Sequence, residues 1–251
     1  MKLVFKTAFL LSALLGCTSP SSPDKSSDTA NQQEANDKVE EIALRQIFNK
    51  MRKLPNTKFT GKQIIRGDST ITLKVTTEFN GQKEGSWIYA AAFSTLCHFG
   101  KDEKITIGSL GIGSSAREAQ DICIQEWFAT FGTALINMLQ NSEAIALSDK
   151  KIFPGLMGIR GNLPENTWLR GDDNMTKTIM SKIGNKIHPE PNKIISIAIN
   201  IMVNNKGSID GECRLNNQVS EELLSNLKQL KWPASEKGFL FKQFYIIKNI
   251  N

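Results

Sequence analysis

Histidine, paired metal-binding motifs and clustered positive charge are scarce in this sequence, and each scarcity excludes a class of function. The chain has only two histidines, His98 and His188, and its four cysteines show no C-x-x-C spacing. Zinc sites normally carry such spacings, so we expect no metal. The formal net charge is +6, but lysine and arginine are scattered and no nucleic-acid-binding motif occurs. Nucleic acid is therefore not an expected partner.

The apolar stretch near the N-terminus is too short to cross a bilayer. It runs from Ala8 to Leu15, behind the cationic residues Lys2 and Lys6 and just ahead of Gly16. A spanning helix needs about 20 apolar residues. The layout is typical of a secretory signal peptide, here residues 1–16.

The residues that follow resemble a lipoprotein cleavage site. Leu14-Leu15-Gly16-Cys17 is similar to the lipobox of bacterial lipoproteins. This resemblance implies cleavage after Gly16 and lipidation of Cys17, and Ser19 implies export to the outer membrane. Two or three acyl chains on one cysteine give stable attachment, because one chain alone binds only marginally. The alternative is an ordinary secreted protein in which Cys17 lies near the signal by chance.

Composition divides the rest of the chain into a tether and one folded domain. Residues 17–37 are rich in serine, proline, aspartate, asparagine and glutamine. Such a segment buries too little apolar surface to offset its ordering entropy, so we expect a flexible tether. Residues 38–251 are long enough for a single globular domain.

Hydrophobic periodicity predicts an α+β fold in which a largely antiparallel sheet packs on one long central helix. An N-terminal helix and a C-terminal β-β-α-β unit complete it, and Asn80-Gly81 is expected to turn between two strands. Helices are expected at residues 37–54, 114–140, 172–183 and 220–230, and strands at 70–79, 87–98, 104–110, 193–203, 208–214 and 239–247.

The long helix has a predicted start signal. Ser115 and Glu118 fit the S-x-x-E capping box, in which each side chain satisfies a backbone donor of the other residue. Three stretches, at residues 111–119, 125–127 and 241–245, faintly resemble an uncharacterised bacterial domain family. This resemblance implies no activity.

A glycine motif precedes the same helix. Gly111-x-Gly113-x-x-Ala116 follows an expected strand and opens a helix, as in dinucleotide-binding sites. The acidic residue that would hold the ribose is missing about twenty residues further on, where the helix continues. We therefore expect a glycine turn that lets the helix pack closely on the sheet, and no cofactor.

Two further patterns suggest hydrolysis, and each has a simpler interpretation. Ser148 and Lys151 have the S-x-x-K spacing of serine acyl-transfer enzymes, but the later elements of that motif are missing. Glu165, Asp172 and Asp173 lie near Trp168, an arrangement that a glycan hydrolase uses. Adjacent aspartates are more often a helix start, so no catalytic residue is assigned.

Three cysteines remain beyond Cys17. Cys97, Cys123 and Cys213 each lie beside apolar residues and are expected to be buried thiols, although a disulfide between two of them is an open alternative. Zinc would need these cysteines with His98, but adjacent strand residues such as Cys97 and His98 point to opposite faces.

These patterns predict a non-enzymatic, lipid-anchored envelope protein. Its folded domain would bind or support another envelope component, with a protein as the expected partner. The alternative is a hydrolase of envelope glycan or peptide that uses residues 154–173 to shape its cleft.

Intact mass spectrometry of the protein, purified from membranes in detergent, tests the anchor. We expect a chain that begins at Cys17 and carries about two or three acyl chains. A chain that begins elsewhere without lipid would contradict this prediction. Alkylation before and after reduction counts free thiols in the same measurement.

Overall fold

The computed structural model describes residues 26–83, 86–99, 103–147, 149–163, 167–184, 187 and 193–250. The chain divides into two units, residues 1–35 and 36–251. The folded core lies in the second unit. Within the described ranges, no helix is long and apolar enough to cross a membrane.

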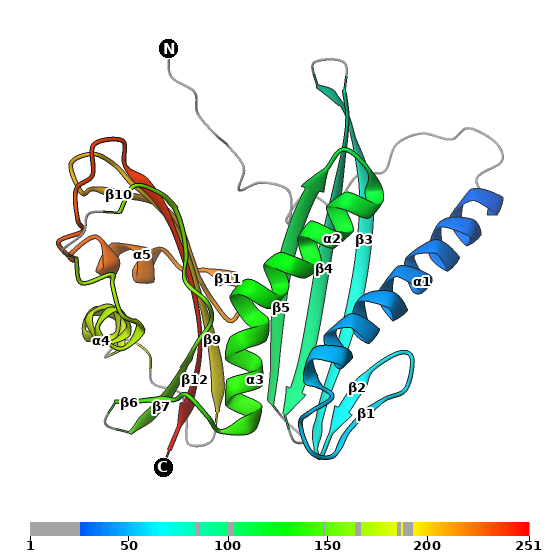
Figure 1. Cartoon of the computed structure of the whole chain (residues 1–251), viewed down its shortest axis with the longest axis horizontal. Coiled ribbons are helices and arrows are strands. Elements are labelled where there is room, and N and C mark those ends of the chain that lie inside the picture. The colour runs from blue at the N-terminus through cyan, green and yellow to red at the C-terminus, as the bar shows by residue number, and fades with distance from the viewer. Residues whose placement is uncertain are drawn as a thin grey trace. The chain divides into compact units, whose positions relative to one another are not determined.

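The predicted α+β class is confirmed, with two antiparallel sheets where the sequence pattern indicated one (Figure 1). The α-helices are α1 (Ser26–Met51), α2 (Ala116–Trp127), α3 (Thr133–Gln140), α4 (Asp172–Ile183) and α5 (Glu221–Leu227). A π-helix, η2 (Phe128–Gly132), joins α2 to α3.

The first sheet is an antiparallel meander of five strands in chain order. These strands are β1 (Thr57–Phe59), β2 (Ile64–Arg66), β3 (Ser69–Lys83), β4 (Ser86–Phe99) and β5 (Glu103–Gly113). Asn80-Gly81, predicted as a turn, lies inside β3, where the pairing with β4 shifts register between Phe79 and Gly81. The dipeptide therefore makes a bulge rather than a turn, and this prediction is wrong.

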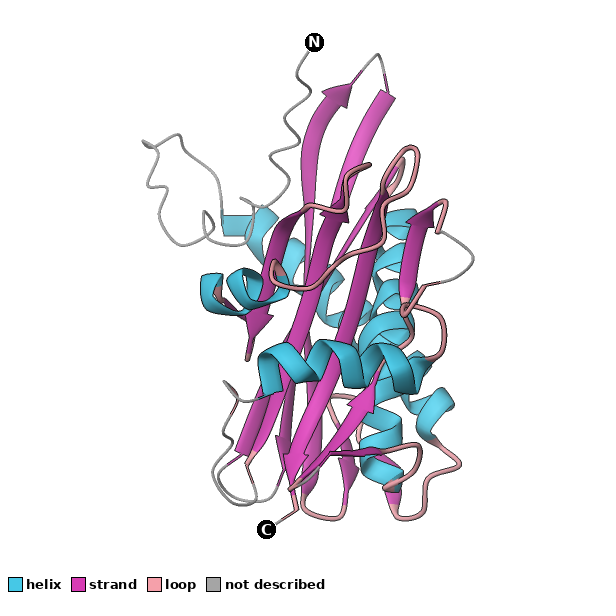
Figure 2. Ribbon diagram, turned by 90° about the vertical axis from the view of Figure 1, so that its left-hand side faces the viewer, coloured by secondary structure: helices cyan, strands magenta, loops and turns pink. Residues whose placement is uncertain are grey.

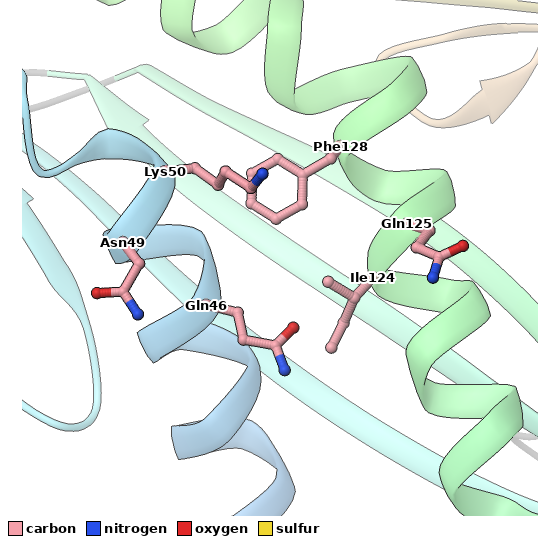
Figure 3. Close-up of a pocket in the computed structure, with 6 residues that line it drawn as sticks. All are labelled: Gln46, Asn49, Lys50, Ile124, Gln125 and Phe128. Atoms are coloured by element: carbon pink, nitrogen blue, oxygen red, sulfur yellow. The ribbon is translucent and has the colours of Figure 1, made fainter.

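Helices α1 and α2 cover one face of this sheet, side by side (Figures 1 and 3). From α1, the side chains of Ala43, Leu44, Ile47 and Met51 are at most 1% exposed. They pack with the apolar residues of β3, β4 and β5 in one core. The apolar stripe of α1 therefore faces the sheet, as its hydrophobic periodicity predicts.

The start of α1 differs from the prediction. The helix begins at Ser26, inside the segment expected to be a flexible tether, and not at Asp37. Residues 30–35 are alanine, asparagine, glutamine and glutamate, and most of these types favour helix without any burial. Polar composition argued against a packed core there, but it does not exclude a helix.

The second sheet has the order β11-β10-β9-β12-β7-β6, and β8 pairs with another part of β12. Its strands are β6 (Ile145–Leu147), β7 (Lys150–Pro154), β8 (Gly158–Gly161), β9 (Ile194–Val203), β10 (Ile209–Leu215), β11 (Gln218–Val219) and β12 (Phe239–Asn249). The predicted β-β-α-β unit is β9, β10, α5 and β12. Strand β12 is central, since it pairs with β9, β7 and β8.

Each face of β12 belongs to a different core. Phe239, Phe241 and Tyr245 are buried against α4 and α5, which lie in front of the strands in Figure 2. Phe244 and Ile246 point to the other face and join the core of the first sheet. This period-2 alternation explains why nearly every residue of β12 is apolar or half-buried.

The long central helix connects the two cores. Helix α2 packs on β4 and β5, while α3 and η2 lie against β7 and β12. Trp127, fully buried, ends α2, and a Cβ on Gly132 would lie 2.8 Å from its ring. Phe131 meets Phe244 of β12 edge to face, with ring centroids 4.6 Å apart. A single helix therefore supplies side chains to both sheets.

The π-helix fits against the segment after β7. The N–H of Leu156 donates to the Ala129 carbonyl at 3.0 Å, and the N–H of Gly155 donates to the Phe244 carbonyl at 2.8 Å. The buried Gln243 amide donates to the Gly155 carbonyl at 2.9 Å. A Cβ on Gly155 would lie only 1.8 Å from the Thr130 carbonyl oxygen. We call this contact of η2 with Gly155 and β12 the π joint.

The π joint predicts that Gly155→Ala is strongly destabilising. The added methyl group must displace backbone, so we expect a loss of about 1–3 kcal/mol in the free energy of unfolding. Gly158→Ala is the matched control, because its Cβ would meet only the Lys242 Cβ at an ordinary 3.5 Å. Urea denaturation of both variants measures the difference. Equal midpoints would contradict the close contact.

Candidate functional site

The glycine motif serves helix packing. Strand β5 continues to Gly113, so these glycines lie in the strand and not in the predicted turn. A Cβ on Gly111 would lie 2.0 Å from the Ala119 carbonyl oxygen, and one on Gly113 would lie 2.7 Å from the Ala119 nitrogen. Close packing of the helix on the sheet, expected from the sequence, is confirmed.

The start of α2 is occupied by the chain's own carboxylate. Ser115 Oγ accepts from the Glu118 N–H at 3.1 Å, as predicted for the capping box. The Glu118 carboxylate accepts from the N–H and hydroxyl of Ser114, one residue before the expected partner. These hydrogen bonds lower the pKa of Glu118. An internal anion thus already lies where a phosphate would bind.

The two hydrolase patterns are not brought together in the described part of the chain. Lys151 lies on β7 and donates to Asn141 Oδ1 at 3.0 Å, whereas Ser148 falls outside the described residues. Glu165 also falls outside them, and Asp172 begins α4, where an N-terminal aspartate was the simpler interpretation.

Trp168 is used inside the fold. Its indole N–H donates to the Lys231 carbonyl at 3.1 Å, and its ring packs on Trp232 with centroids 5.1 Å apart. Trp232 in turn contacts Phe241 of β12. These contacts pack the partly buried Trp168 against the second core.

The three cysteines are buried free thiols, as expected. Cys97 faces the core from β4, while the neighbouring His98 is half-buried, and His188 falls outside the described residues. Cys123 on α2 lies 3.2 Å from the Ser109 hydroxyl. Among the residues that the structure describes, no group of three histidine, cysteine or acidic side chains is placed to hold a metal ion.

A groove of about 420 Å³ runs between α1 and α2 (Figure 3). We call it the α1–α2 groove. Its lining is Gln46, Asn49 and Lys50 from α1, with Ile124, Gln125 and Phe128 from α2 and η2. The amide groups and the Lys50 ammonium can donate hydrogen bonds to a ligand, and the lining contains no carboxylate.

A second pocket, of about 160 Å³, lies at the π joint. We call it the π pocket. It is lined by Glu126, Ala129 and Thr130 of the central helix, by residues 156–160, and by Leu240 and Lys242 of β12. The Lys242 ammonium contacts the Glu126 carboxylate at 2.6 Å, with both side chains about one-third exposed.

Exposed apolar side chains surround this ion pair. Leu156 is 56% exposed at the pocket wall. Met202, 51% exposed, lies directly opposite Leu240 on the neighbouring strand β9, and Arg160 lies opposite Leu240 on the other side. We call Ile122, Leu156, Arg160, Met202 and Leu240 the apolar rim.

Ile122 belongs to this rim because of its place on α2. It lies one turn before Glu126, so both side chains project from the same face of the helix. Residues 124, 125 and 128 project toward α1. Ile122, which is 38% exposed, therefore lies on the side of α2 that looks toward the second sheet.

The sequence prediction missed the π pocket. Glu126 and Lys242 are 116 positions apart, and an acid and a base that are one-third exposed form no sequence motif. One signal did exist: each residue lies inside one of the three stretches that resemble an uncharacterised family. Two of those stretches, residues 125–127 and 241–245, meet at the π joint.

Because the thiols are buried, we expect the free energy of unfolding to fall at alkaline pH. Burial raises the pKa of Cys97 to about 12, and the pKa of Cys213 to about 12 with help from the nearby charges of Glu212 and Glu221. The unfolded chain releases these protons above about pH 8.5, whereas the folded chain keeps them. Stability from this source is thus complete below about pH 8 and declines as the pH rises toward 12.

Alkylation kinetics test the burial of the thiols from which this prediction follows. With iodoacetamide at neutral pH, we expect no labelling of Cys97 and Cys213 in the folded protein and full labelling in urea, because only the thiolate reacts. Peptide mapping assigns the label to each position. Rapid labelling of either thiol in the folded chain would contradict the burial described above.

Comparison with known proteins adds a family but no activity. A search of curated proteins and a search of solved structures found no match. The model of one family, described as a family of unknown function (DUF6348), matches residues 60–249. Because this match covers most of the chain, the protein belongs to the DUF6348 family.

Proposed function

We propose that this protein is a lipid-anchored envelope protein whose folded domain binds another envelope protein through the apolar rim and the π pocket. The observation that carries the proposal is the gathering of exposed apolar side chains around the Glu126–Lys242 ion pair. Soluble surfaces usually scatter such side chains singly.

The composition of the rim supports a protein partner. Leucine, isoleucine, methionine and arginine side chains surround a small polar centre, and methionine and arginine are enriched in protein interfaces. The apolar parts supply area that is removed from water on binding. Arg160 and the Glu126–Lys242 pair supply directional contacts that orient the partner.

The extent of the family match supports the π pocket over the α1–α2 groove. Every residue of the apolar rim and of the π pocket lies within residues 60–249. The groove instead takes Gln46, Asn49 and Lys50 from α1, which precedes the matched residues. A function shared through the family domain would therefore use the π pocket.

The anchor is the second half of the proposal. Lipid on Cys17 would hold the chain at a membrane, with the outer membrane as the proposed location because Ser19 follows. Attachment confines the domain to the surface where its partner lies and raises the effective concentration of that partner. A weak interface of modest area then suffices for lasting contact.

Site-directed photo-cross-linking in cells tests the binding surface. With a photoreactive residue at position 202, we expect a reproducible protein adduct, and with the same residue at position 42 we expect none. Ile42 is a fair control because it is 57% exposed, close to the 51% of Met202, and lies on α1.

A variant pair then tests the energetics. Met202→Asp should weaken binding of the cross-linked partner by about tenfold or more, as for other central interface side chains, whereas Ile42→Asp should not. Surface plasmon resonance with the purified partner measures both. Adducts at position 42 alone, or equal affinities, would refute the proposed surface.

A further inference from the structure

Strand β5 is the outer edge of the first sheet in the described part of the chain, and part of it packs against β9 of the second sheet. It is the last strand of the first sheet and pairs only with β4 in the described part of the chain. No backbone hydrogen bond joins its outer side to another described residue. In an edge strand every second residue directs its N–H and C=O outward, so the exposed part of β5, around Leu110 and Ile112, offers donors and acceptors to an added strand.

The charged residues of β5 are confined to its start, at Glu103 and Lys104, and are missing from residues 105–113. This segment contains no charged residue and no proline. Gly111 and Gly113 face α2, so Leu110 and Ile112 point to the opposite side of the sheet, where they are 40% and 51% exposed. Natural edges of this length normally carry a lysine, a proline or a covering segment.

Where the edge is exposed, at Leu110 and Ile112, an added strand would have apolar neighbours on both of its faces. Strand β5 lies beside β9 of the second sheet, which carries Met202 (Figure 1). On one side of an added strand, alternate side chains would meet Ile122 of α2. On the other side they would continue the apolar row of Leu110 and Ile112.

We propose that the partner inserts an extended, uncharged peptide segment that pairs with the outer edge of β5, beside the apolar rim. Only an extended backbone matches a row of alternating N–H and C=O groups. A second copy of this chain, pairing through its own β5, is the competing occupant that sedimentation tests below. This inference rests on the proposed function, since it specifies how the partner is held.

A synthetic peptide tests the pairing. The probe is a short strand of alternating threonine and valine with a lysine at each end, and its control is the same peptide with every backbone nitrogen methylated. We expect the probe to bind the full chain and to slow hydrogen exchange at the amides of residues 105–113. The methylated peptide should bind about tenfold or more weakly, because it cannot donate main-chain hydrogen bonds.

Substitutions supply the matched controls. Ile112→Lys should weaken binding of the probe by about tenfold or more, because a charged side chain at an edge opposes strand addition. Ile42→Lys changes the same residue type at similar exposure on α1 and should leave binding unchanged. Equal binding of both peptides, or no protection of β5, overturns the inference.

Two further outcomes separate the hypotheses. If sedimentation shows a dimer of the wild type that Ile112→Lys dissociates, a second copy occupies the edge and the inference is wrong. If Met202→Asp weakens binding of the cellular partner, but that partner does not slow hydrogen exchange at the β5 amides, the inference is also wrong and the proposed function stands. If Ile112→Lys weakens binding of the partner and Met202→Asp does not, strand pairing is supported, and the apolar rim is not the binding surface.

Discussion

The π joint is the contact on which the rest of the structure depends. Gly155 lies against the Thr130 carbonyl so closely that no side chain fits, and hydrogen bonds from Leu156 and Gln243 fix the segment on both sides. A π-helix widens the helix locally and changes which side chains face the neighbour. Here that change lets one helix serve two sheets.

The same contact places the charged pair. Helix α2 follows the first sheet, and Glu126 lies just before the π-helix begins. Because η2 packs against β12, the Glu126 carboxylate reaches Lys242 on the second sheet. An ion pair that is one-third exposed contributes little stability. Under the proposed function, the pair instead provides a polar centre among apolar side chains that orients the partner.

Local features of the fold could be predicted from the sequence, and its long-range features could not. Periodicity indicated α4 and the C-terminal strands, and the capping signal at Ser115 marked the start of α2. The bulge near Gly81 could not be distinguished from a turn, because both favour the same residue types.

The candidate site depends on contacts that no short motif encodes. The two faces of β12 contribute to two different cores, one of which also contains residues of η2, and this arrangement depends on contacts between distant parts of the chain. The π pocket likewise joins residues more than a hundred positions apart. Several described residues that stood out in the sequence have structural contacts instead. Gly111 packs a helix, Trp168 fills a core and the cysteines are buried.

The position of β12 in the chain also determines when the protein can fold. The first sheet is built from neighbouring strands and has mostly local pairings, so it can form early. The second sheet lacks its central strand until residues 239–249 are available, although β6 and β7 are made about a hundred residues before. During synthesis the chain therefore passes through a stage in which the first sheet is complete and apolar strands of the second sheet are still unpaired. Chaperones that bind exposed strands would have most to do in that interval.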